Sequence, residues 1–177
     1  MLTKGGRPGE IMEEDVMKHI SAAAVVGCLG LFLAVGQEKD LATAAAAYEK
    51  HDYATAFTIW EPLAESGSAP AQFNLALLFY DGRGVPQDFE RAAKWFEKAA
   101  DQGYTNAQRN LGELYFIGKG VKRDYVQSYK WFNLCAASGN ETCTDHRDQV
   151  AKKLSDSKLA EAQRLAREWK PKVKAAP

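Results

Sequence analysis

The sequence predicts an all-α fold built from repeated helical hairpins. The chain of 177 residues repeats itself at an interval of 36 residues, and its apolar residues recur at steps of three and four. Such steps place side chains on one face of a helix, and the 28 Ala residues also favour helix. A hydrophobic content of 46% is enough for a packed core, so disorder throughout the chain is excluded.

The charge balance narrows the classes of partner. Lys and Arg together number 23, Asp and Glu also number 23, and the formal net charge is therefore zero. A neutral chain lacks the basic surface that general binding to nucleic acid requires. We therefore expect no nucleic-acid partner.

The first feature along the chain is an apolar run over residues 20–36 that contains no charged side chain. Lys18 precedes it, and Ala34 and Gly36 are small residues at positions −3 and −1 for a cut before Gln37. This order is typical of a secretory signal peptide, and it predicts a periplasmic or secreted protein. Two alternatives stay open. The run is near the lower limit for crossing a bilayer and would suit an uncleaved inner-membrane anchor, or it forms a buried core helix.

The residues upstream of this run do not suit a signal peptide. Glu10, Glu13 and Glu14 are acidic, whereas a signal peptide begins with a basic segment. Met17 is the more natural start of the chain in this interpretation. We expect residues 1–36 to form an N-terminal extension and signal peptide, separate from the folded domain.

Two segments, residues 70–103 and 106–139, carry the clearest repeat, with 14 identical positions among 34. In each segment an apolar helical face is followed by a Gly-x-Gly turn, an Asp, a Trp-Phe pair and a closing Gly. Gly accepts the positive φ angles that end a helix, and Asp is a favoured N-cap residue. Each segment therefore predicts helix, turn and helix, and Asp88 is expected to begin the second helix of the first segment.

A degenerate unit precedes these repeats at residues 41–67. It keeps the apolar positions of a second helix, including Trp60, but its Gly-x-Gly turn is missing. We expect its first helix at about residues 41–50, followed by a tight turn at His51-Asp52.

A decayed unit follows the repeats at residues 141–169. Arg147 takes the position that Leu occupies in both full repeats, and Ser155 is placed to begin a last, capping helix. Terminal repeats are often atypical because they close the open end of a stack. Residues 170–177 are expected to form a free tail.

The pattern Ala-x-x-x-Leu, aromatic residue, Gly-x-Gly-Val, Asp, Trp-Phe, Ala-Ala and closing Gly resembles the Sel-one-like repeat, a relative of the tetratricopeptide repeat. The resemblance covers residues 70–139 specifically and residues 41–67 more loosely. It implies a right-handed α–α superhelix, or solenoid, whose first helices line a concave surface. Members of the family commonly act as scaffolds or adaptors for proteins or envelope components, and they bring no catalytic residues and no cofactor.

The resemblance also implies which side chains face a ligand. The alternative is that Leu77, Tyr80 and Phe116 only pack against neighbouring helices. If they are exposed together, they form an apolar stripe with a charged border, suited to a protein or peptide partner. We expect the chain to be a monomer that binds such a partner weakly. The positions carried over from tetratricopeptide units are Phe73, Leu77, Tyr80, Asn106, Arg109, Glu113 and Phe116.

Cys135 and Cys143 are the most specific local signal. A turn between two expected helices separates them, and two helices joined in this way can bring the Cβ atoms to about 3.8 Å, as a disulfide requires. The pair also resembles a cysteine-rich, secreted branch of the same family, in which such pairs join helices. One alternative is two buried thiols that replace Ala. A metal site with His146 lacks a fourth ligand, so we expect no metal.

No motif in the sequence indicates catalysis. The chain contains no GxSxG, HExxH or Walker loop, and its Gly-x-Gly turns recur in both repeats, as structural turns do. We therefore expect an exported, non-catalytic scaffold that contacts a membrane only if residues 20–36 remain as an anchor. The alternative is a cell-envelope enzyme or wall-fragment-binding protein of the cysteine-rich Sel-one-like type.

Overall fold

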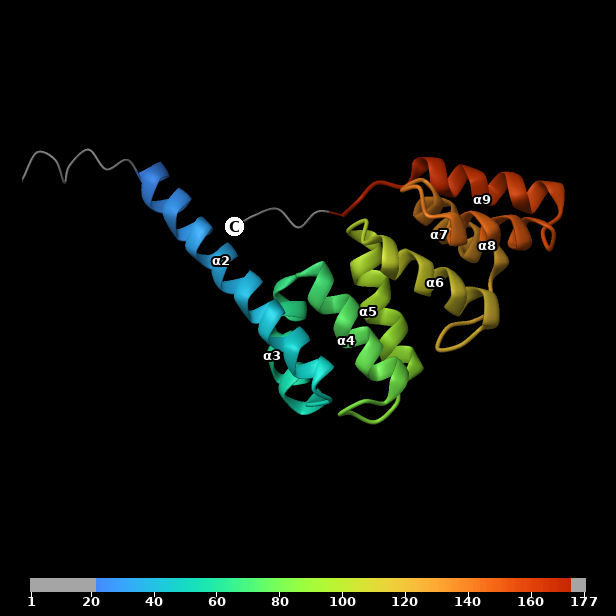
Figure 1. Ribbon diagram of the computed structural model, residues 1–177. Helices are drawn as coiled ribbons and strands as arrows, with labels where there is room; N and C mark the ends of the chain where they lie inside the picture. Colours follow the sequence, from blue (N-terminus) through green and yellow to red (C-terminus); the bar gives the residue numbers. More distant parts are fainter. Residues whose placement is uncertain (1–21, 173–177) are drawn as a thin grey trace, which may run out of the picture. The chain divides into compact units, whose positions relative to one another are not determined.

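The computed structural model describes residues 22–172, and it places side chains from residue 36 onward. The described part of the chain is all-α and contains no strand (Figure 1). The chain divides into two compact units, Met1–Asp40 and Leu41–Pro177, and the repeats belong to the second. The helices are α2 (Ala22–Glu49), α3 (Tyr53–Ser66), α4 (Ala69–Asp81), α5 (Phe89–Asp101), α6 (Thr105–Ile117), α7 (Tyr125–Ala136), α8 (Glu141–Ala151) and α9 (Asp156–Glu168).

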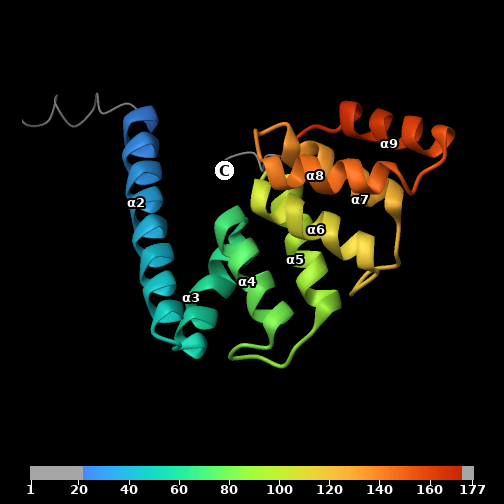
Figure 2. The same cartoon turned by 45° about the vertical axis from the view of Figure 1, so that its right-hand side comes forward.

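Helices α3 to α8 form a right-handed α–α superhelix, as the sequence predicts. Each of these helices packs against the next one along the chain, and Figure 2 shows α4 beside α5 and α6 beside α7. The last helix, α9, packs against α7. The fold is therefore a stack of helical hairpins in which α4, α6 and α8 are the first helices of successive hairpins.

The N-terminal helix differs from its prediction. A helix was expected at about residues 41–50, but α2 begins at Ala22. Residues 37–40 contain no Pro or Gly that would end a helix, so helical backbone continues through them. Much of the predicted signal peptide, residues 1–21, lies outside the described residues. Among the residues that are described, no helix is long and apolar enough to cross a membrane.

The same capping interaction recurs once per repeat at the start of a second helix. The Asp52 carboxylate accepts a hydrogen bond from the Thr55 backbone N–H at 3.1 Å, and Asp88 accepts one from Arg91 at 2.9 Å. Asp124 accepts from two backbone N–H groups, at 2.8 and 3.1 Å. These three residues lie 36 positions apart, so the predicted cap at Asp88 is one of a series.

A buried Gln ties each full repeat to the hairpin before it. The Gln72 side chain donates to the Ala64 carbonyl at 3.0 Å, and the Gln108 side chain donates to the Ala100 carbonyl at 3.3 Å. Ala64 and Ala100 are near the ends of α3 and α5, where helix carbonyls lack partners within their own helix. Each carbonyl also accepts a backbone hydrogen bond, from Gly67 or Gly103, so the Gln side chain adds a second bond that joins neighbouring hairpins.

A pair of aromatic rings in edge-to-face or tilted contact, with a cation from the following hairpin over one ring, also recurs along the stack. The ring pairs join the end of a first helix to the start of the second helix, with centroids 5.2, 5.3 and 5.6 Å apart. Each cation lies 3.8 to 5.8 Å from a ring of its pair. The three sets are Tyr48, Tyr53 and Arg83; Tyr80, Phe89 and Lys119; and Phe116, Tyr125 and Lys153.

The C-terminal segment returns to the middle of the stack. The Trp169 ring lies 6.3 Å from that of Trp131, and Lys172 donates to the Asp101 carbonyl from its backbone N–H at 2.7 Å. The Lys172 ammonium also pairs with the Asp101 carboxylate at 2.6 Å. The sequence predicts a free tail over residues 170–177. This prediction is wrong for the part up to Lys172, which is bound to Asp101.

Candidate functional site

One pocket lies between the first helices α4 and α6. Its volume is about 270 Å³, and Phe96 of α5, which is 1% exposed, contributes to its lining. Tyr80 is half-buried, whereas Asp81 and Glu113 are exposed at the rim. The lining residues are Leu77, Tyr80, Asp81, Phe96, Asn110, Glu113 and Leu114.

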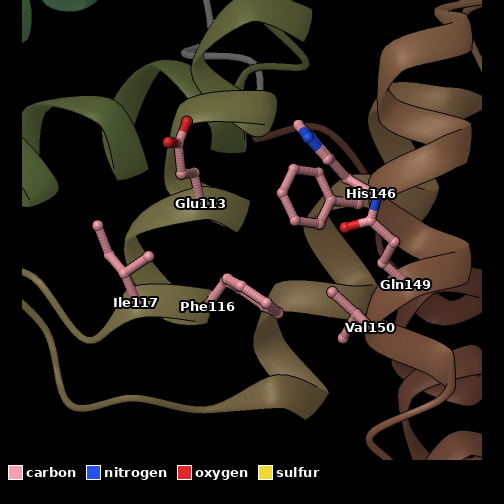
Figure 3. Close-up of a pocket in the computed structure, with 7 residues that line it drawn as sticks. Glu113, Phe116, Ile117, His146, Gln149 and Val150 are labelled. Carbon is pink, nitrogen blue, oxygen red and sulfur yellow. The ribbon is translucent and has the colours of Figure 1, made fainter.

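A second pocket, of about 190 Å³, lies between α6 and α8. Figure 3 shows its α6 side chains facing those of α8 across the opening. Ile117 is 47% exposed at this opening, whereas Phe132 of α7 is 2% exposed. The lining residues are Glu113, Phe116, Ile117, Phe132, His146, Gln149 and Val150.

The two pockets are copies of one another in the repeat. Adding 36 to the number of each of the seven residues around the α4–α6 pocket gives the seven residues around the α6–α8 pocket. Glu113 belongs to both sets and forms the wall between them. We refer to the residues of both pockets together as the first-helix face. The face therefore presents two equivalent openings whose shape derives from the repeat and whose chemistry differs.

The chemistry of the first-helix face is acidic at the rim and apolar below it. Asp81 and Glu113 contribute two carboxylates, and no Lys or Arg lines either pocket. Asp81 lies 3.4 Å from Arg83, but no ion pair involving Glu113 forms within the described part of the chain. Burial raises the pKa of Tyr80, and the negative charges of Glu113 and Asp81 raise it further.

Four of the seven residues predicted to face a ligand lie on the first-helix face: Leu77, Tyr80, Glu113 and Phe116. The other three line neither pocket. Phe73 packs against Phe96 and Tyr104, with ring centroids 5.7 and 5.2 Å apart. Asn106 is exposed, and the Nε atom of Arg109 is buried and has no hydrogen-bond partner among the residues that the structure describes.

The sequence prediction missed the whole wall that α8 contributes to the α6–α8 pocket. His146, Gln149 and Val150 were not assigned to the site because Arg147 made this segment look decayed. The signal was nevertheless present, since these residues stand 36 positions after Asn110, Glu113 and Leu114. Phe96, Asn110, Leu114, Ile117 and Phe132 were also not assigned to the site.

The sequence model of the Sel1 repeat matches residues 69–104 and 105–140. These two matches cover α4 to α7, the helices that enclose the α4–α6 pocket and contribute one side of the second pocket. The chain contains two Sel1 repeats. This confirms the resemblance stated from the sequence.

Solved structures of Sel1-repeat proteins share the fold. A protective antigen present in uropathogenic Escherichia coli strains, which displays an SLR fold, is 34% identical over 75% of this chain, with a TM-score of 0.72. A Sel1 repeat protein from Oxalobacter formigenes is 26% identical over 72% of this chain, with a TM-score of 0.60. The chain spans only 29% and 55% of the lengths of these two proteins. None of the curated proteins matches the chain at a significant level.

A disulfide joins the second Sel1 repeat to α8. Cys135 of α7 and Cys143 of α8 are bonded, their Cα atoms are 5.8 Å apart, and both side chains are fully buried. Their sulfur atoms are therefore bonded to each other and are not metal ligands. In the described part of the chain, no group of three His, Cys, Asp or Glu side chains is placed to hold a metal ion. The bond fixes the start of the helix that carries His146, Gln149 and Val150.

Proposed function

We propose that this Sel1-repeat protein is exported and acts as a non-catalytic scaffold, which binds a segment of a partner protein on the concave side of its first helices. The observation that carries the proposal is the pair of repeat-related pockets on the first-helix face. Scaffolds built from Sel1 repeats support protein interaction, and a repeated pocket suits a ligand that extends along the stack. Neither pocket has the size typical of a small-molecule site, about 300 Å³ or more.

Export is supported by the disulfide and by the apolar run at residues 20–36. Disulfides persist in the periplasm and outside the cell and are rare in the cytosol. The test is the intact mass of the protein purified from its own cells, with and without reduction and alkylation. We expect a chain that begins at Gln37. Its mass should be two hydrogen atoms below that of the reduced protein, because Cys135 and Cys143 are bonded to each other. A full-length chain with free thiols would contradict export.

Partner binding is tested by placing a charge in a pocket. Ile117 is 47% exposed, so the Ile117→Lys variant is expected to fold while placing an ammonium at the opening of the α6–α8 pocket. The matched control is Thr58→Lys, which adds the same charge at an exposed position on α3. We expect a partner to co-purify with the parent and with the control but not with Ile117→Lys. Equal recovery with both variants would contradict the proposed face.

A wall-fragment-binding protein or envelope enzyme is the second candidate. It is favoured by one observation, since the carboxylate of Glu113 and the imidazole of His146 line the same pocket. Such a pair is able to move a proton if both groups reach the substrate. Incubation of the oxidised protein with cell-wall fragments tests this candidate. Release of a product that depends on both Glu113 and His146 would favour the enzyme over the scaffold.

A further inference from the structure

We propose that the partner segment carries a basic residue, Lys or Arg, between two apolar residues. The basic side chain pairs with Glu113 at the wall, and the two apolar side chains enter the pockets on either side of it. This inference rests on the proposed function and adds the chemistry of the ligand.

The charge of the first-helix face selects the basic residue. Glu113 is exposed, borders both pockets and forms no ion pair within residues 36–172. Arg109, one turn earlier on α6, forms no ion pair with Glu113, and two cations of the neighbouring turns have other partners. Lys119 lies 3.8 Å from the ring centroid of Phe89, and Arg83 donates to the Tyr48 hydroxyl at 2.7 Å. A ligand cation would therefore meet a carboxylate that has no competing ion-pair partner among the described residues.

The interior of both pockets selects apolar side chains. Phe96 in one pocket and Phe132 in the other are almost fully buried, at 1% and 2% exposure. Leu114 and Val150 are the corresponding aliphatic residues of the two pockets, and each is 1% exposed. Volumes of about 270 and 190 Å³ leave room for one side chain each rather than for a whole ligand.

The position of α6 between the pockets sets the spacing of the motif. A helix with its side chains is about 10 Å across, and an extended chain advances about 3.3 Å per residue. An extended segment therefore reaches from one pocket to the other in about three residues. The motif has apolar residues about three positions apart, with the basic residue between them.

The same charges exclude ligands rich in phosphate. A nucleic acid or a phosphopeptide requires Lys or Arg at the binding surface, and neither residue type lines either pocket. The ligand class is thus a basic and apolar peptide segment rather than an acidic one.

The experiment selects ligands without assuming a partner. A random peptide library displayed on phage is panned against the oxidised parent protein, and the enriched peptides are synthesised for affinity measurements. We expect the enriched sequences to share a Lys or Arg between two apolar residues. The measured affinity is expected to fall about tenfold in Glu113→Gln, because a charge-assisted pair is lost. The control Glu61→Gln removes another exposed carboxylate, from α3, and should leave the affinity unchanged.

A charge exchange makes the test specific to the proposed pair. The variant Glu113→Lys should bind a selected peptide in which Glu replaces the basic residue better than it binds the original peptide. Melting temperatures of all variants should match that of the parent, since Glu113 is exposed.

Failure of this inference and failure of the proposed function give different results. Enriched peptides without a basic residue, or with equal affinity for parent and Glu113→Gln, would overturn the inference while leaving peptide binding intact. A library from which no peptide is enriched would overturn the proposed function, and the inference with it.

Discussion

Single glycines control how closely successive hairpins approach. Gly120 has a φ of +71°, and a Cβ atom added there would lie 2.0 Å from the carbonyl oxygen of Phe89 in the preceding second helix. Gly84 occupies the same position one repeat earlier, and its Cβ would lie 2.7 Å from that of Tyr53. The second Gly of each Gly-x-Gly turn is thus required for two reasons. Its backbone adopts a positive φ, and a side chain at this position would collide with the preceding hairpin.

We predict that Gly120→Ala destabilises the fold far more than Gly139→Ala. Gly139 also has a positive φ, +85°, but a Cβ added there would meet nothing within 4 Å. Its replacement should therefore cost only the backbone strain, about 1 kcal/mol. Gly120→Ala adds a collision with backbone that cannot rotate away, and we expect about 3 kcal/mol or more. Urea unfolding of both variants measures the difference, and equal losses would contradict the packing of Gly120 on Phe89.

The N-cap Asp88 provides a prediction with a pH dependence. The hydrogen bond that Asp88 accepts from the Arg91 backbone N–H is the main cause of a lowered pKa of its carboxyl group. A second hydrogen bond, from the Arg91 side chain, lowers this pKa further. Because the carboxyl has a lower pKa in the folded state, its ionised form stabilises the fold at pH values above the unfolded pKa of Asp. This contribution is lost as the pH falls through the pKa of the folded state. Asp88→Ala should therefore be less stable than the parent near neutral pH. Urea unfolding at several pH values should show the two proteins converging in acid, and a constant gap would contradict the cap.

At the scale of the element, α8 determines whether the first-helix face has one pocket or two. It supplies three of the seven residues of the α6–α8 pocket, and the disulfide ties its first turn to α7. The loop closed by the disulfide is short, so its effect on the unfolded chain is about 2–3 kcal/mol. The second pocket should depend on the oxidised state of the protein.

We predict that the double variant Cys135→Ser with Cys143→Ser loosens α8 selectively. Hydrogen exchange should become faster at the backbone amides of α8, whereas the amides of α4 should keep the protection of the parent. The helix α4 serves as the internal control because the disulfide does not involve it. Equal acceleration in α4 and α8 would indicate that the bond supports the whole stack instead.

The success of sequence prediction also differs between elements. The hairpins α4–α5 and α6–α7 were predictable because their core and turn positions, such as Leu75 and Leu111, must repeat for the stack to pack. The start of α2 was not, since helical periodicity alone does not mark where a helix begins without a cap. The wall on α8 was missed because Arg147 replaces a core Leu, although His146 beside it keeps its place in the pocket.

At the scale of the molecule, the repeat organises both stability and the candidate site. The same interval of 36 residues relates the N-cap Asp residues, the buried Gln side chains and all seven positions of the two pockets. Residues that hold the stack together keep their identity between repeats. Six of the seven residues that line the pockets change, for example from Asn110 to His146 and from Asp81 to Ile117. This division is what a scaffold requires if one architecture is to recognise different side chains along a single partner.

Site-specific photo-crosslinking is the most direct test of partner binding on the first-helix face. A photoreactive amino acid is placed at Asp81 or at Ile117, two exposed rim positions 36 residues apart, and at Lys94, an exposed control on the second helix α5. We expect Asp81 and Ile117 to crosslink to one segment of the same partner, at points about three residues apart when mapped by mass spectrometry. No partner should be captured from Lys94. Capture from Lys94 alone, or of unrelated proteins from the two rim positions, would contradict a single ligand on the first-helix face.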